Sequence, residues 1–167
     1  VTPLVSPPAR DAFTLAYDIK RERVVMFGGL GFRDTWEWDG ATWSLRQPSV
    51  APPARAGHAM AYDPIGDRVV MFGGRTSLQG TSSEIADTWS WDGTNWTQIV
   101  GPGPSTRSDA AMAFDPVRGV IVLYGGAFPP DITMSDTWEL SGTTWTERTS
   151  TTTPGPRRQH SMTFDPV

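Results

Sequence analysis

Acidic side chains that recur at matched positions are the first candidates for chemistry in this chain. An aspartate precedes Thr-Trp three times, at Asp34, Asp87 and Asp136. Converging carboxylates can hold a hard cation, and three of them would suggest a metal ring. These three are dispersed along the chain, and no segment has the clustered Asp/Asn spacing of a calcium loop. Each stands where a loop would enter a strand, so we expect each to accept hydrogen bonds from loop N–H groups and to bind no metal.

Arginines recur in the same way and suggest an anion site. Arg10, Arg55, Arg107 and Arg157 each follow a proline-rich approach. Guanidinium groups bind anionic groups in a bidentate manner, so a cluster of them would attract an anionic ligand. The alternative is that each arginine pairs with a carboxylate of its own or the next repeat. We expect this pairing, because a residue that every repeat carries usually serves the repeat itself.

Two histidines occupy corresponding positions, and the chain offers no nucleophile with a base. The place of His58 and His160 is taken by Phe13 and Ala110 in the other repeats, which favours packing over catalysis or ligand binding. Cysteine is absent, which excludes disulfides, Cys-ligated zinc and a thiol nucleophile. There is no Gly-x-Ser-x-Gly elbow, phosphate loop or dinucleotide fingerprint. We therefore expect no catalytic residues and no cofactor.

Composition narrows the class of protein further. The net charge of −4 gives no general attraction to nucleic acid or to anionic membranes. No apolar run approaches the roughly 18 residues of a membrane span. With 17 Gly and 15 Pro and no sustained helical spacing of apolar residues, the sequence predicts an all-β fold.

A repeated apolar strand organises the chain. The string Arg-Val-Val-Met-Phe-Gly-Gly occurs at residues 23–29 and 68–74, and an altered form occupies residues 119–126. Four consecutive apolar residues predict a strand buried on both faces. A strand of period two precedes each copy, with large residues on one face and small residues on the other, as in residues 58–62. We expect this preceding strand to be the innermost of its sheet.

Two further strands follow each Gly-Gly pair. The third strand begins at Asp-Thr-Trp, and an Asp-Gly or Ser-Gly turn joins it to a fourth strand that carries Trp43, Trp96 or Trp145. Asp-Gly between aromatic strands is a strong hairpin signal. Side-chain parity places the tryptophans of the third and fourth strands on one face. Each unit is thus predicted to be a four-stranded antiparallel meander.

The Gly-Gly pair, the Asp-Thr-Trp and the later Trp, recurring three times in order, resemble the kelch repeat of β-propellers. The repeats span approximately residues 9–53, 54–105 and 106–155, and a fourth begins over residues 156–167. The resemblance is greatest to kelch-type repeats of bacterial, often exported, proteins, which implies an extracellular or periplasmic location. Kelch propellers close with more blades than this, so we expect the missing blades to come from a longer chain or from self-association.

The resemblance implies a non-catalytic binding or scaffolding module for a protein or a glycan. The alternative is the non-catalytic portion of a kelch-fold carbohydrate-active enzyme, of the sugar oxidase or isomerase type, whose site residues lie outside this segment. The segments between Gly-Gly and Asp-Thr-Trp differ in length, at residues 30–33, 75–86 and 127–135, and variable loops on a rigid scaffold are common recognition sites. They are equally compatible with tolerant surface loops. The ligand contacts we predict are Arg33, Arg75, Gln79, Glu84, Phe128 and Asp131.

Overall fold

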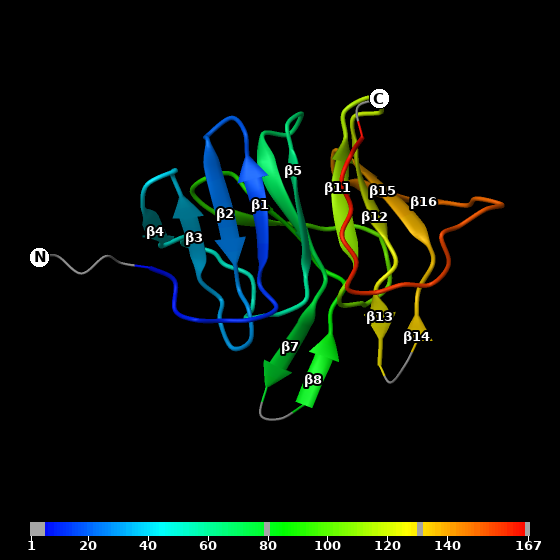
Figure 1. Ribbon diagram of the computed structural model, residues 1–167, viewed down its shortest axis with the longest axis horizontal. Coiled ribbons are helices and arrows are strands. Elements are labelled where there is room, and N and C mark those ends of the chain that lie inside the picture. The colour runs from blue at the N-terminus through cyan, green and yellow to red at the C-terminus, as the bar shows by residue number, and fades with distance from the viewer. Residues whose placement is uncertain (1–5, 79–80, 130–131, 166–167) are drawn as a thin grey trace, which may run out of the picture.

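The computed structural model describes residues 6–78, 81–129 and 132–165, and this part of the chain contains strands and no helix. Three four-stranded antiparallel sheets follow one another along the chain and fan out side by side (Figure 1). The first consists of β1 (Thr14–Asp18), β2 (Arg23–Phe27), β3 (Thr35–Trp38) and β4 (Trp43–Arg46). The second consists of β5 (Ala59–Asp63), β6 (Arg68–Phe72), β9 (Thr88–Trp91) and β10 (Trp96–Ile99). The third consists of β11 (Ala111–Asp115), β12 (Val120–Tyr124), β15 (Thr137–Ser141) and β16 (Thr144–Arg148).

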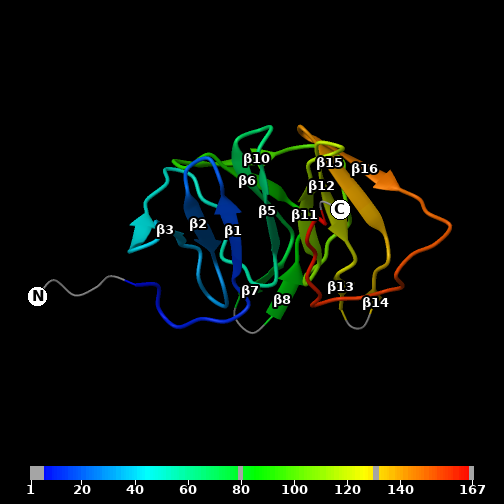
Figure 2. The ribbon, with the colours of Figure 1, turned by 45° about the horizontal axis from the view of Figure 1, so that its top comes forward.

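Each sheet is a meander in which strands that are neighbours in sequence pair in space, and in the second and third sheets an insertion separates the middle two strands in sequence. We call the three sheets the first, second and third blade. The innermost strands of the three sheets are neighbours, because β5 contacts both β1 and β11 (Figure 2). The predicted all-β propeller segment of three four-stranded units is therefore confirmed.

The second blade packs one face on the first blade and the opposite face on the third blade. The second blade turns Met60, Met71 and Trp91 toward the first blade, where they meet Val25 and Phe27. Its opposite face presents Ala59, Ala61 and Phe72 to the third blade. The inner strand therefore turns large residues such as Met60 toward the preceding blade and alanines toward the following one, and we call the latter side the small-residue face. The apolar strand Val69–Phe72 lies between these layers and is almost completely buried, as its sequence predicts.

Two of the variable segments, for which the sequence predicts loops, form short hairpins. The first consists of β7 (Arg75–Leu78) and β8 (Thr81–Glu84), and the second of β13 (Ala127–Phe128) and β14 (Ile132–Thr133). Backbone bridges from Ala56 to Arg75 and from Ser108 to Ala127 tie each hairpin to the segment that leads into an inner strand. Each bridge aligns the first residue of the insertion with that segment through backbone hydrogen bonds. Hydrophobic periodicity therefore gives no signal for these hairpins.

The two hairpins emerge from the same end of the blades (Figure 1). The Asp-Gly turns lie at the opposite end, because a meander reverses direction at every strand. We call the first the hairpin end and the second the outer-turn end. All three variable segments connect the second strand of a blade to the third, so they share the hairpin end.

Candidate recognition surface at the hairpin end

Identical Arg–Asp clusters fix the hairpin end of every blade. In the second blade the buried guanidinium of Arg55 donates to both carboxylate oxygens of Asp87, at 2.5 and 2.9 Å, and to the carbonyl of Gly73 at 3.1 Å. The indole Nε1 of Trp89 donates to the same carboxylate at 2.6 Å. The first blade repeats this with Arg10, Asp34 and Trp36, and the third with Arg107, Asp136 and Trp138.

These clusters explain what the recurrent charges do. Burial alone would raise the pKa of Asp87, but the hydrogen bonds and charge of Arg55 and the bond from Trp89 outweigh it and hold the pKa below its ordinary value. The same balance lowers the pKa of Asp34 and of Asp136. Arg10, Arg55 and Arg107 therefore pair with carboxylates of their own blades, as predicted, and join the proline-rich approach to the third strand. Arg157 differs, because it donates to the backbone carbonyls of Pro154 and Gly155.

A chain of backbone hydrogen bonds links the blades around the centre. The residue two positions after each repeated arginine has a left-handed backbone: Ala12, Gly57, Asp109 and Gln159 have φ values of 52°, 62°, 59° and 56°. The N–H of Gly57 donates to the carbonyl of Ala12 at 2.9 Å, and Asp109 and Gln159 continue the series at 2.7 and 2.9 Å. A left-handed conformation costs a residue with a side chain about 1–3 kcal/mol. Because the same conformation recurs from blade to blade, we infer that it is imposed by the series of hydrogen bonds among these four residues, which we call the central belt.

A polar cluster lies where this belt meets the first hairpin. Arg75, at the base of β7, donates to Oδ2 of Asp109 at 2.9 Å, and the hydroxyl of Ser108 donates to the same oxygen at 3.2 Å. Gly57 packs closely against this carboxylate: a Cβ at this position would lie only 2.7 Å from Oδ1 of Asp109. Arg75 thus joins the second and third blades across the centre.

The belt residues line a central hollow with a volume of about 460 Å³. Its wall includes Phe13, Arg75, Asp109, Ala110 and Gln159. Small-molecule sites usually measure about 300–1,000 Å³ and combine an apolar wall with a few polar groups. The hollow therefore has the size and the mixed chemistry to receive a polar group of a ligand.

The two histidines beside this hollow serve packing. His58 is buried, and its ring packs edge-to-face with that of Phe27, with the ring centroids 5.7 Å apart. His160 packs with Tyr124 in the same way, with the ring centroids 5.8 Å apart. Burial, and after it the charge of Arg55, lowers the pKa of His58 to about 3. A neutral, buried ring without hydrogen-bond partners fits the packing position that its exchange with Phe13 predicts.

The second hairpin presents an apolar surface. Phe128 and Ile132 are direct cross-strand partners, so their side chains share one face of the hairpin. Their side chains are 40% and 57% exposed. Leu30 lies between β2 and β3, and hence at the same end, and its side chain is 46% exposed. These residues form a broken apolar rim beside the polar cluster.

The predicted ligand contacts fall into three groups. Arg33 and Phe128 are exposed at the hairpin end. Arg75 is engaged with Asp109, and Glu84 lies opposite Arg75 in the ladder of the first hairpin. Gln79 and Asp131 lie outside the described residues. The structure thus places Arg75 in the central cluster and leaves Phe128 on the rim.

The belt residues and Ile132 could not be identified from the sequence. Ala12, Gly57, Asp109 and Gln159 share no side-chain type, and their only common signal is the constant spacing from the repeated arginines. Ile132 is recognisable only through its pairing with Phe128. Among the described residues, no group of three or more His, Cys, Asp or Glu side chains converges to hold a metal ion. The described part of the chain also holds no helix long and apolar enough to cross a membrane.

Comparison with known proteins agrees with this architecture. A solved structure titled "Structure of YjhT" superposes with a TM-score of 0.67 at 14% sequence identity, covering 86% of this chain and 47% of that one. The chain thus spans about half the length of this structural relative. A search of curated proteins found no significant match. The family model described as the KLHDC2/KLHL20/DRC7 Kelch-repeats domain matches residues 2–166, and the chain therefore belongs to the kelch-repeat family.

Proposed function

We propose that this segment is a binding module that recognises a protein or a glycan through its hairpin end. The proposal rests on the variable segments at the hairpin end, which do not repeat from blade to blade. The sheets and Arg–Asp clusters repeat from blade to blade, whereas the variable segments differ in length and in side chains. Variable segments on a rigid scaffold are where recognition residues concentrate.

The chemistry of the rim favours a ligand with both an apolar and a polar surface. Phe128 offers an exposed ring beside Pro129, and Ile132 extends the apolar surface on the same face. Aromatic rings bind well to the apolar face of a sugar or to a peptide side chain. Arg75, Asp109 and Gln159 stand at the adjacent hollow, where they can exchange hydrogen bonds with a polar group. A peptide segment or an oligosaccharide meets both requirements.

The test begins with a screen of the chain against a glycan array and a displayed peptide library, followed by calorimetry with the best probe. Shortening both hairpins to the length of residues 30–33, while keeping Arg75 and Ala127 at their bases, is expected to abolish binding. The matched control lengthens the Asp39-Gly40 and Asp92-Gly93 turns at the outer-turn end by two glycines each, and it should leave affinity unchanged.

A point variant sharpens the same test. Phe128→Ala is expected to weaken binding at least about ten-fold, as for a central aromatic contact. Val117→Ala removes an exposed apolar side chain from the turn between β11 and β12, at the outer-turn end, and should have no effect. Full affinity in the doubly shortened chain, or a loss caused by Val117→Ala alone, would refute recognition by the hairpin end.

A further inference from the structure

The turn between the first two strands of a blade has one backbone frame but different side chains in each blade. An aspartate caps each turn and accepts the backbone N–H of the residue three positions later at 3.0 Å. The pairs are Asp18 with Arg21, Asp63 with Gly66, and Asp115 with Arg118. These turns lie at the outer-turn end. We call the contact of the first blade with the second the first interface, and that of the second with the third the second interface.

At the first interface, the turn forms an ionic contact with the next blade. Asp67 of the second blade accepts a hydrogen bond from Nζ of Lys20 at 2.5 Å and from both terminal nitrogens of Arg21, at 2.9 and 3.2 Å. The hydroxyl of Tyr62, also in the second blade, donates to the same carboxylate at 3.1 Å. One carboxylate thus binds two cations of the neighbouring blade. We call Lys20, Arg21 and Asp67 the ionic clasp.

Arg21 is anchored on its own blade as well. It donates to Oδ2 of Asp18 at 2.8 Å, and Asp18 is fully buried. It also lies against the outer turn of the second blade, where a Cβ on Gly93 would stand 2.6 Å from Nε of Arg21. An isolated surface ion pair contributes little, in part because two mobile side chains must be ordered. The anchor on Asp18 reduces this entropic cost, so the ionic clasp contributes more than an ordinary surface pair.

The second interface has an apolar contact in the same place. Ile65 and Gly119 occupy the positions of Lys20 and Asp67, counted from the aspartate that caps each turn. They lie so close that a Cβ on Gly119 would stand 2.8 Å from Cδ1 of Ile65. Arg68 also crosses this interface, but it reaches the uncharged backbone carbonyl of Gly142. The two interfaces are therefore held differently at the outer-turn end.

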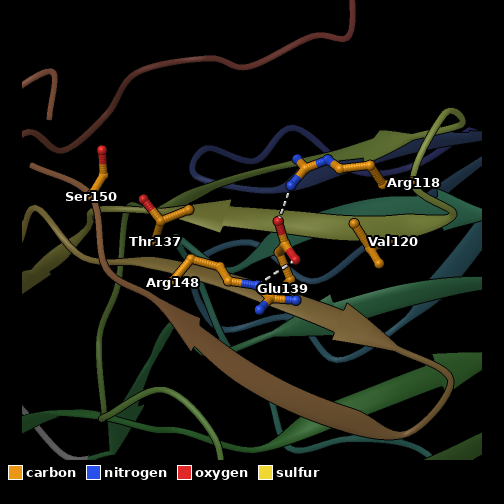
Figure 3. Close-up of a pocket in the computed structure, with 6 residues that line it drawn as sticks. All are labelled: Arg118, Val120, Thr137, Glu139, Arg148 and Ser150. Atoms are coloured by element: carbon orange, nitrogen blue, oxygen red, sulfur yellow. Dashed lines mark hydrogen bonds and ion pairs between the residues drawn. The ribbon is translucent and has the colours of Figure 1, made fainter. Parts of the chain in front are cut away.

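The third blade shows a second arrangement of the turn arginine. Arg118, the counterpart of Arg21, donates to Asp115 at 2.7 Å and contacts Glu139 in its own sheet. Figure 3 shows Glu139 between Arg118 and Arg148, which all belong to the third blade. An arginine at this position can thus bind carboxylates of its own blade alone. The contrast identifies Asp67 as the group that draws Arg21 across the first interface.

The first interface also borders the central hollow. Ala12, Phe13 and Thr14 of the first blade line this hollow together with Gly57 of the second. The belt bond from Gly57 to the carbonyl of Ala12 joins the two blades there. A movement of the first blade on the second therefore changes the wall of the hollow.

We propose that the first interface is a salt-sensitive contact, which the ionic clasp keeps closed at low ionic strength and which opens as ionic strength rises. The side chains of Lys20 and Asp67 are 66% and 29% exposed, so dissolved ions reach the charges and screen them. Opening displaces the first blade and with it one wall of the central hollow. This proposal is independent of the ligand proposed above.

The second interface is expected to respond less to salt. The contact of Ile65 with Gly119 involves no charge. An ion pair does join Arg75 to Asp109 at the hairpin end, but these side chains are only 27% and 15% exposed. Charges that are partly buried are screened much less than exposed ones. The difference between the interfaces is therefore the quantity to measure.

The test follows amide hydrogen exchange of the full chain by NMR at constant pH. Two N–H groups bridge each interface, those of Gly29 and Gly57 at the first and those of Gly74 and Asp109 at the second. Sodium chloride is raised from about 20 mM to about 500 mM, which shortens the screening length several-fold. Opening at Gly29 and Gly57 should rise about three- to ten-fold, whereas opening at Gly74 and Asp109 should change less than about two-fold.

Two variants with the same loss of charge separate the ionic clasp from a general effect of salt. Asp67 has a left-handed φ of 50°, which asparagine tolerates, so Asp67→Asn removes the charge with little change in the backbone. Opening at Gly29 and Gly57 should then be raised at low salt and should no longer respond to salt. Glu22→Gln is the matched control, because Glu22 is exposed and has a φ of 54° at the corresponding place in the first blade. It should keep the native response.

A further variant transfers the contact to the second interface. Ile65→Lys combined with Gly119→Asp places a cation and a carboxylate at the positions of Lys20 and Asp67. Gly119 has a φ of 67°, close to the value that Asp67 adopts, so an aspartate is compatible with this turn. Opening at Gly74 should then gain a salt response of at least about two-fold.

Three results would overturn the proposal. The first is an equal response of the two interfaces to salt in the native chain, a comparison that needs no variant. The second is a native salt response at Gly29 and Gly57 in Asp67→Asn. The third is a second interface that remains insensitive to salt after Ile65→Lys and Gly119→Asp.

Discussion

The Arg–Asp clusters and the two hairpins lie at the same end of the molecule but follow opposite rules. The clusters recur with the same partners in all three blades, from Arg10 with Asp34 to Arg107 with Asp136. The hairpins differ in length and exposed chemistry, and the first blade has only a short segment in their place. This contrast indicates that the recurrent charges hold each blade together, and it is the basis of our proposal that the variable segments serve a ligand.

Removing one cluster should have the largest effect on stability. The guanidinium of Arg55 is buried and satisfies Asp87 and the carbonyl of Gly73. Arg55→Ala leaves a partly buried carboxylate without its cation and a buried carbonyl without this donor, so we expect a loss of about 3–5 kcal/mol in the free energy of unfolding. The free energy of unfolding is measured by urea denaturation. Arg33→Ala, an exposed arginine at the same end, should change stability by less than about 0.5 kcal/mol and is the control.

Overfilling the small-residue face should have an intermediate effect. Ala61 is buried against the cluster that includes Met112 in the third blade. Ala61→Leu adds three carbon atoms to this contact and should cost about 1–3 kcal/mol through overpacking. Ala41→Leu, in an exposed outer turn, is the control in the same denaturant titration. Equal stability of the two variants would show that the small face of the inner strand is not a packing constraint.

A smaller effect should appear as a dependence on pH. The pKa of His58 is about 3 in the folded chain, against an ordinary value of 6.5, because of burial and then the charge of Arg55. Between these values the unfolded chain binds a proton that the folded chain does not, so stability falls as the pH falls from 6.5 toward 3. His58 changes the free energy of unfolding by at most about 1.4 kcal/mol per pH unit.

His58→Phe tests this directly, since Phe13 fills the same position in the first blade. Stability measured by urea titration between about pH 5 and 7 should depend less on pH in this variant. His160→Phe is the matched control, and its effect should be weaker because His160 is only partly buried. An unchanged pH dependence in His58→Phe would mean that the ring becomes charged within the fold.

The repeating part of the structure was predictable because each of its signals recurs. The apolar strand, the Asp-Gly turn and the paired tryptophans each mark one strand of the meander, and three copies fix their order. The pairing of Arg55 with a carboxylate followed from the same repetition. A strand buried on both faces, such as Val69–Phe72, is also a strong signal because it needs no polar alternation.

The parts that sequence could not provide depend on the backbone or on contacts between blades. The left-handed turn at Ala12 and Asp109 is imposed by hydrogen bonds that link neighbouring blades, and neither residue type indicates it. The hairpin of β7 and β8 begins at a backbone bridge from Arg75 to Ala56. The contact of Arg118 with Glu139 joins residues that ordinary strand spacing does not relate. Long-range geometry decides each of these features.

The central claim is that the hairpins are separable from the structure that the Arg–Asp clusters maintain. One urea titration tests it, comparing the native chain, the chain with both hairpins shortened, and Arg55→Ala. The shortened chain should unfold within about 0.5 kcal/mol of the native chain, because Arg75 and Ala127 remain at the hairpin bases and none of the other hairpin residues whose burial the structure describes is buried. Arg55→Ala should unfold far earlier. A shortened chain as unstable as Arg55→Ala would contradict the account, since the hairpins would then be part of the fold.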